Sequence, residues 1–151
     1  MIYIGVDPGK SGAYAIIAES ETGKAVFAYP WDDMFFAMEM ASIMQRKAEG
    51  IVAAVEKVGA MKGQGVTSMF NFGKNAGYIE GVLTALGIPY QLIPPKKWKG
   101  EFGLNSDKAA SVAVCKRLFP DVSLRRSDRC RKDDDGMAEA LLMAEYAKRK
   151  M

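Results

Sequence analysis

Four acidic side chains stand where folding could gather them into one metal site. Asp7 follows the apolar run 2–6, and Glu56 follows the apolar run 51–55. Asp135 and Glu139 are four residues apart in a helical pattern, so they share one helix face. Carboxylate oxygens are the ligands that Mg²⁺ prefers, and bound metal ions can activate water for hydrolysis. These acids therefore predict a candidate hydrolytic metal centre.

Each acid also has a structural explanation, which the sequence alone leaves open. Asp7 could accept hydrogen bonds from the turn at Pro8 and Gly9. Asp133 and Asp134 have the position of capping, solvated residues before the last helix, and capping could also explain part of Asp135. Like charges four residues apart repel by about 0.2–0.5 kcal/mol on a helix, however, and a divalent cation would turn that repulsion into coordination.

Other kinds of chemistry have little support. The sequence has no histidine, which excludes histidine triads and histidine-ligated metals. Two cysteines, Cys115 and Cys130, predict neither a zinc site nor a disulfide framework. The segment from Gly5 to Lys10 has three residues between its glycines, whereas a phosphate-binding loop needs four. Acid–base and metal chemistry must therefore fall to carboxylates and lysines.

The first half of the sequence predicts elements that would bring Asp7 and Glu56 together. Short apolar runs at 2–6, 13–18 and 25–29 indicate three antiparallel strands. A helix over 34–49, capped by Asp32 or Asp33, leads to a fourth strand at 51–55. That crossover permits the fourth strand to lie parallel to the first, so Asp7 and Glu56 would meet at one edge of the sheet.

A long helix comes next, after a glycine-rich loop over 57–66. Thr67 or Ser68 is the expected cap, and the helix should reach about residue 86. Glycines recur every fourth residue on one face, at Gly73, Gly77 and Gly81. Each costs about 1 kcal/mol relative to alanine, which indicates close approach of another backbone. Packing within the domain and a dimer interface both remain open.

The remaining sequence is basic. A short strand over 90–93 precedes residues 94–132, which hold eleven Lys and Arg against four Asp and Glu. This local excess of +7 leaves −4 for the rest of a chain whose net charge is +3. Such a segment indicates a polyanion partner or a solvated surface stripe. Trp98, among lysines, would stack on a base or pack under its loop. A helix over 107–119, capped by Asn105 or Ser106, leads to a basic loop.

Composition places these elements in one α/β domain, residues 1–151. The chain is 49% hydrophobic and 26% charged, an ordinary balance for a globular domain. No apolar run reaches membrane-spanning length, and the first residues form a strand rather than a signal peptide. We therefore expect an intracellular, cytoplasmic protein with no membrane partner.

The order of these motifs resembles the RuvC-like Holliday-junction resolvases of the ribonuclease H-like superfamily, especially their phage-type branch. The resemblance covers nearly the whole chain. It depends on the residues at 5–9, 11–12, 55–56, 71–81, 95–99, 107–108 and 135–141. It implies a five-stranded mixed sheet, three strands antiparallel and the others parallel, flanked by helices. It also implies a homodimer that nicks branched DNA symmetrically, in a host cytoplasm if the protein is phage-encoded.

The resemblance further implies a role for each motif. Asp7, Glu56, Asp135 and Glu139 would hold two Mg²⁺ ions, which Mn²⁺ could replace, and Lys99 and Lys108 would lie near the scissile phosphate as catalytic cations. The glycines of the long helix would form the dimer interface. Together with the basic segment, this predicts a DNA-binding set: Lys62, Lys96, Lys97, Trp98, Lys99, Lys108, Arg125, Arg126, Arg129 and Arg131.

The sequence departs from the cellular resolvases at two points. Those members space their last two acids three residues apart, and Gly136 would occupy that position here, so Asp133 or Asp134 could substitute. The loop after Glu56 offers Met61 where cellular members carry a base-probing aromatic residue.

The sequence is compatible with two functions other than that of a junction resolvase. A flap, branch or RNA–DNA hybrid nuclease on the same fold and a non-catalytic junction-binding protein both remain open. An actin-like sugar kinase is excluded, because 151 residues are too few for its two lobes.

Overall fold

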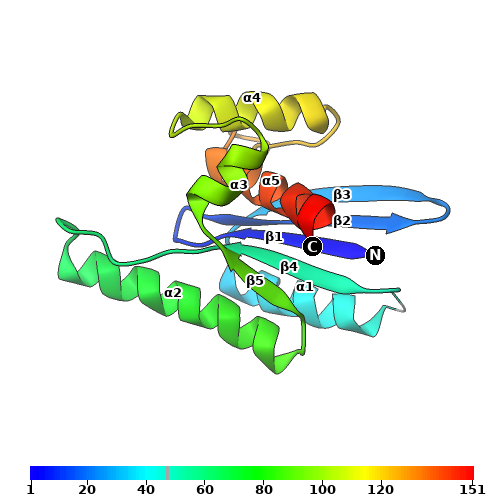
Figure 1. Ribbon diagram of the computed structural model, residues 1–151, viewed down its shortest axis with the longest axis horizontal. Coiled ribbons are helices and arrows are strands. Elements are labelled where there is room, and N and C mark those ends of the chain that lie inside the picture. Colours follow the sequence, from blue (N-terminus) through cyan, green and yellow to red (C-terminus); the bar gives the residue numbers. More distant parts are fainter. Residues whose placement is uncertain (47) are drawn as a thin grey trace.

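A five-stranded mixed sheet forms the centre of the protein, whose computed structural model describes residues 1–46 and 48–151. Its strands lie in the order β3-β2-β1-β4-β5, with helices on both faces (Figure 1). Their bounds are Ile2–Asp7 for β1, Ala13–Ser20 for β2, Gly23–Pro30 for β3, Ile51–Glu56 for β4 and Tyr90–Ile93 for β5. The mixed sheet predicted from the sequence is confirmed.

Strand β1 lies at the middle of the sheet and sets the position of the first acid. It pairs antiparallel with β2, where Val6 faces Tyr14, and parallel with β4, where Val6 faces Val55. Because β1 and β4 run in the same direction, Asp7 and Glu56 come at the same edge of the sheet. The predicted crossover is thereby confirmed.

Helices cover the two faces unequally. Helices α1 (Asp33–Gln45) and α2 (Val66–Ala85) lie on one face, and α5 (Asp135–Lys150) crosses the other (Figure 1). Helices α3 (Pro95–Glu101) and α4 (Lys108–Leu118) lie outside α5. Each face of the sheet therefore has its own apolar core, one around α5 and one beneath α1 and α2.

Several predicted boundaries need correction. Helix α1 begins after Asp32 as expected but ends at Gln45 rather than near residue 49, and residue 47 lies outside the described residues. Gly65, not Thr67 or Ser68, precedes α2 and makes no side-chain capping bond. Helix α4 is capped by Asp107, whose carboxylate accepts a hydrogen bond from the Ala109 amide.

The segment around Trp98, expected as a loop, forms helix α3. Pro95 occupies its first turn, where the missing amide hydrogen costs nothing and the fixed φ suits a helix. This helix turns Trp98 inward and leaves Lys96 and Lys97 exposed. The helical conformation thus separates side chains that a loop would have left together.

Close packing of α5 on β1 explains one glycine. A Cβ atom at Gly5 would overlap the backbone of Ala140 and Ala144, so strand and helix are nearly in backbone contact. Small residues on both elements therefore set the depth at which α5 lies. No helix among residues 1–46 and 48–151 is long and apolar enough to cross a membrane.

Candidate active site

The first two acids come from the adjoining ends of β1 and β4. Asp7 is the last residue of β1, and Glu56 is the last residue of β4. Burial raises the pKa of Asp7 well above its usual range, and the negative charges of Glu56, Glu139 and Asp135 raise it further, against an opposing effect of Lys108. Asp7 is thus close enough to each of the other three predicted acids for their charges to act on it.

The other two acids come from the start of α5. Asp134 caps this helix, because its side chain accepts a hydrogen bond from the Met137 amide. One turn of helix separates Asp135 from Glu139, and Glu139 is buried with 6% of its surface exposed. The start of α5 lies beside the end of β1, because a Cβ atom added at Gly136 would lie 3.3 Å from Asp7 Oδ2. The Asp135 side chain nevertheless keeps 39% of its surface exposed.

Two lysines neutralise the acids on α5. The Lys108 ammonium lies 2.9 Å from the Asp135 carboxylate, and this hydrogen bond lowers the pKa of Asp135 and raises that of Lys108. The Lys99 ammonium lies 3.5 Å from Glu139, which also accepts a 3.5 Å hydrogen bond from the buried hydroxyl of Ser111. Both lysines predicted for the site are therefore in it.

Trp98 holds Glu56 and is not a stacking platform. Its ring is fully buried, and its indole Nε1–H donates a 2.7 Å hydrogen bond to Glu56 Oε2. Burial raises the pKa of Glu56, and this hydrogen bond opposes the rise. The predicted contact of Trp98 with DNA is wrong, and the alternative that it packs beneath its own segment is confirmed.

The turn after Asp7 is tied to the rest of the site. Gly9 has a φ of +130°, which side chains rarely adopt, and its amide donates a 2.7 Å hydrogen bond to Asn75 on α2. Arg126 donates to the carbonyl groups of Ser11, over 2.6 Å, and Gly12, over 3.2 Å. Helix α2 and the segment before α5 therefore both hold this turn.

Arg126 and Asp134 form an ion pair inside the protein, which corrects two predictions. Arg126 Nε lies 2.6 Å from Asp134 Oδ2, and both side chains are partly buried. Arg126 is thus engaged within the chain and is not a free DNA contact. Asp134 is a cap, as predicted, but it is not solvated, and Asp133 is paired with Lys116 at 3.0 Å. Of these three neighbouring acids, Asp135 is the one coupled to Asp7.

The rest of the predicted DNA-binding set is exposed. Within residues 1–46 and 48–151, no carboxylate forms a salt bridge with any of these side chains. The exposed, unpaired members are Lys62, Lys96, Lys97, Arg125, Arg129 and Arg131. Their charge is thus available to a polyanion.

The glycine face of α2 has no partner in the described chain. Cβ atoms added at Gly73, Gly77 and Gly81 would meet no atom within 4 Å. Phe70 is also 69% exposed near the start of this helix. Packing within the domain, one of the two explanations for these glycines, is therefore not observed.

The chemistry of the acids suits a divalent cation, but their side chains do not form a complete coordination site. Within the part of the chain that the structure describes, no three acidic side chains are arranged closely enough to hold an ion together. Yet Asp7 is within electrostatic reach of three other carboxylates, and two of these are already paired with ammonium groups. Hard oxygen ligands with excess negative charge are those that Mg²⁺ and Mn²⁺ accept.

Sequence reasoning missed the residues that position these acids. Asn75, Ser111 and the pairing of Arg126 with Asp134 had no recognisable signal, because each contact joins segments distant in the chain. The hydrogen bond from Trp98 was equally hidden, although the indole of a buried tryptophan commonly finds an acceptor.

Comparison with known proteins identifies the fold. The sequence matches no protein-family model and has no significant match among curated proteins. Its structure is similar to Thermus thermophilus RuvC in complex with a Holliday junction substrate, with a TM-score of 0.64, 13% identity, and coverage of 99% of this chain and 97% of that chain. A second Thermus thermophilus RuvC structure has a TM-score of 0.59 and 17% identity, and the match covers 99% of this chain and 96% of that chain.

The yeast mitochondrial Holliday junction resolvase Ydc2 has a TM-score of 0.51, 17% identity, and coverage of 97% of this chain and 77% of that chain. The chain therefore has the ribonuclease H-like fold of RuvC, and the resemblance inferred from its motifs is confirmed at the level of structure.

Proposed function

We propose that this protein is a Mg²⁺-dependent endonuclease that nicks Holliday junctions and related branched DNA symmetrically as a homodimer. The observation that carries the proposal is the position of Asp7 and Glu56 at the ends of adjacent parallel strands, beside the start of the helix that bears Asp135 and Glu139. Likeness in fold to two junction-resolving enzymes favours DNA over other phosphodiester substrates.

Asp7, Glu56, Asp135 and Glu139 would hold the ions, two in each site, and Mn²⁺ would substitute for Mg²⁺. When bound, such ions supply a water-derived nucleophile at neutral pH and stabilise the leaving oxygen of a phosphodiester. The contribution of the chain is to aim these four carboxylates. Trp98 orients Glu56, and the Ser111 hydroxyl orients Glu139.

Lys99 and Lys108 have two roles in this proposal. In the protein alone, their ammonium groups balance the charge of Glu139 and Asp135. With DNA bound, the same groups would face the scissile phosphate and stabilise the negative charge that grows on its oxygens. Lys108 is the more accessible candidate, since 71% of its side chain is exposed, against 19% for Lys99.

The exposed basic side chains would bind the DNA backbone outside the site. Arg125, Arg129 and Arg131 come from the loop between α4 and α5, and Lys96 and Lys97 come from α3. Without salt-bridge partners in the described residues, they lose little when a phosphate arrives. These contacts would position a junction rather than read its bases.

A dimer would supply the two cuts that resolution requires. The glycine face of α2 lacks a partner within the chain and allows close approach of a second backbone. A two-fold dimer through this face would place equivalent sites on equivalent strands of a four-way junction.

The experiment that tests the nuclease is cleavage of an end-labelled four-way junction with Mg²⁺ and with EDTA. We expect paired, symmetric nicks with Mg²⁺ and none with EDTA, and Glu56→Gln should bind the junction without cutting it. Flap DNA and an RNA–DNA hybrid of the same sequence are the comparison substrates. Equal or faster cutting of either would overturn the preference for junctions.

A non-catalytic junction-binding protein is the second candidate, and the ion pairs at the site favour it. In that function, Lys99 and Lys108 would permanently neutralise Glu139 and Asp135. The wild-type protein would then bind the junction tightly but leave it uncut at every Mg²⁺ and Mn²⁺ concentration. Cutting abolished by Asp7→Asn would exclude it.

A further inference from the structure

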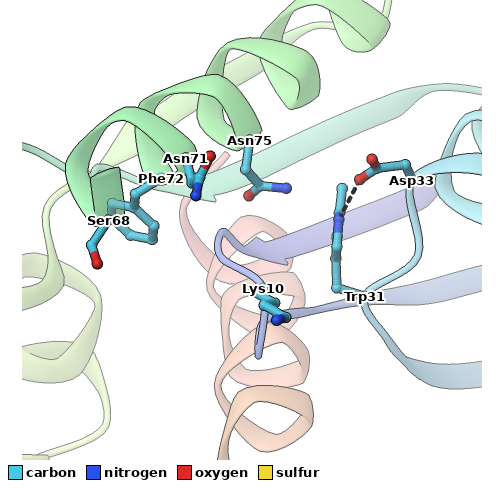
Figure 2. Close-up of a pocket in the computed structure, with 7 residues that line it drawn as sticks. All are labelled: Lys10, Trp31, Asp33, Ser68, Asn71, Phe72 and Asn75. Atoms are coloured by element: carbon cyan, nitrogen blue, oxygen red, sulfur yellow. Dashed lines mark hydrogen bonds between the residues drawn. The ribbon is translucent and has the colours of Figure 1, made fainter. Parts of the chain in front are cut away.

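We propose that the pocket between the turn after Asp7 and the first half of α2 binds one unpaired nucleotide of the DNA strand, next to the phosphate that is cut. This inference rests on the proposed function, which it deepens by assigning a nucleotide subsite. The pocket has a volume of about 590 Å³ and is lined by Lys10, Trp31, Asp33, Ser68, Asn71, Phe72 and Asn75 (Figure 2).

The place of the pocket relates it to the acids. Lys10 belongs to the turn that directly follows Asp7, only three residues along the chain. Asn75 joins the pocket to the same turn, because its Oδ1 accepts the hydrogen bond from the Gly9 amide. A strand whose phosphate lies at Asp7 would therefore pass its next nucleotide over Lys10.

The lining supplies a cation for the nucleotide's phosphate. Lys10 is exposed, and no carboxylate of residues 1–46 and 48–151 forms a salt bridge with it. Asp33, the acid of the pocket, already accepts a 2.7 Å hydrogen bond from the Trp31 indole at one oxygen. Lys10 is thus free to neutralise a phosphate, while Asp33 is partly satisfied.

The lining also supplies groups for a base. Asn71 is exposed and lines the same pocket as Trp31 (Figure 2). An Asn amide carries both a donor and an acceptor, the pair that reads a base edge. The oxygen of Asn75 is occupied by Gly9, which leaves its NH₂ group to donate. The rings of Phe72 and Trp31 offer apolar surfaces against which a base can lie.

Size and shape favour a single nucleotide over duplex DNA. The volume falls within the range of about 300–1,000 Å³ typical of small-ligand pockets. A paired base cannot present its edge and face to such a recess, whereas a base released at a branch point can. Branched DNA, which has weakly stacked bases at its centre, would supply one at low cost.

The first test measures junction binding in EDTA, so that it does not depend on cutting. Lys10→Ala should weaken binding. It should also reduce the salt slope, which is the steepness of the fall in log binding constant with log salt concentration, by about 0.7–0.9, the value for one phosphate contact. Asn71→Ala should weaken binding about tenfold and leave the salt slope unchanged. Lys24→Ala, at the start of β3, and Thr84→Ala, near the end of α2, are the control variants. If Lys10→Ala and Asn71→Ala bind like these controls, the pocket is not a nucleotide site.

The second test uses junctions with a single abasic nucleotide on either side of the cutting position. The wild-type protein should bind one of these junctions about tenfold more weakly than the intact junction, and Asn71→Ala should not distinguish the two. Equal sensitivity of both proteins to the abasic site would overturn the assignment of a base to Asn71. A wild-type protein that cuts junctions yet shows no such difference would refute the pocket and leave the nuclease intact. If the protein distinguishes the abasic junction but never cuts DNA, the nucleotide pocket is supported and the nuclease is refuted.

Discussion

Replacing Trp98 with Phe should lower the free energy of unfolding by an amount that depends on pH. The substitution keeps an aromatic ring in the core and removes the Nε1–H group that lies 2.7 Å from Glu56 Oε2. A hydrogen bond to a charged group contributes about 1.5–3 kcal/mol, and one between neutral groups contributes about 0.5–1.5 kcal/mol. The smaller ring also leaves a cavity, whose cost does not depend on pH.

The direction of the pH dependence follows from Glu56. Burial already raises its pKa above the usual 4.5, and the Trp98 hydrogen bond opposes that rise. Without the indole donor, the folded-state pKa rises further, so ionising Glu56 costs the folded state more. This cost appears as the pH rises through the unfolded-state pKa towards the folded-state pKa, and it is absent where Glu56 is protonated in both states. Trp98→Phe should therefore destabilise the protein by about 1 kcal/mol more at pH 8 than at pH 4.

Urea unfolding in EDTA at both pH values measures this difference. In a Glu56→Gln background, Trp98→Phe should cost the same at pH 4 and pH 8, because no carboxylate remains for the indole to stabilise. Trp31→Phe is the control, since Trp31 also donates to a carboxylate, but that of the exposed Asp33. A loss that is equal at both pH values, or unchanged by Glu56→Gln, would refute the positioning role of Trp98.

Three further predictions concern charge, assembly and DNA. Asp7→Asn should abolish cutting but raise the melting temperature in EDTA at pH 8, and this gain should vanish towards pH 4. The reason is that the raised pKa of Asp7 means that its ionised form destabilises the fold. A lower melting temperature at pH 8 would contradict this. Gly77→Leu should keep the fold and shift sedimentation towards monomer, and a wild-type protein that is monomeric at micromolar concentration would contradict the dimer. Arg129→Ala should lower the salt slope of junction binding by about 0.9. Arg126→Ala should chiefly lower the melting temperature, because Arg126 is paired with Asp134. An equal loss of salt slope in both variants would contradict the role of this ion pair.

The sequence was informative about the acids because each follows a local pattern. Short apolar runs ending in Asp7 and Glu56 predicted strands, and the helix between them predicted that these strands lie parallel. The four-residue spacing of Asp135 and Glu139 needed only a helix to place them on one face. Local pattern and handedness of connection were sufficient for this part of the site.

The partners of these acids could not be predicted in the same way. Trp98 and Glu56 are 42 residues apart, and Gly9 and Asn75 are 66 apart. Whether such side chains meet depends on how α2 and α3 pack on the sheet, which no local pattern encodes. Trp98 was expected in a loop among lysines, whereas Pro95 begins a short helix that turns the indole inward.

The depth of α5 connects the fold to the site. Gly5 lets the backbone of β1 approach Ala140 and Ala144, so the helix lies closer to the sheet than larger side chains would allow. Glu139 immediately precedes Ala140, and its carboxylate is therefore carried down to the level of the strand ends, where it raises the pKa of Asp7. A shallower helix would leave the acids of α5 in solvent and separate them from those of β1 and β4. The small residues at this crossing therefore help to bring the acids of α5 beside Asp7.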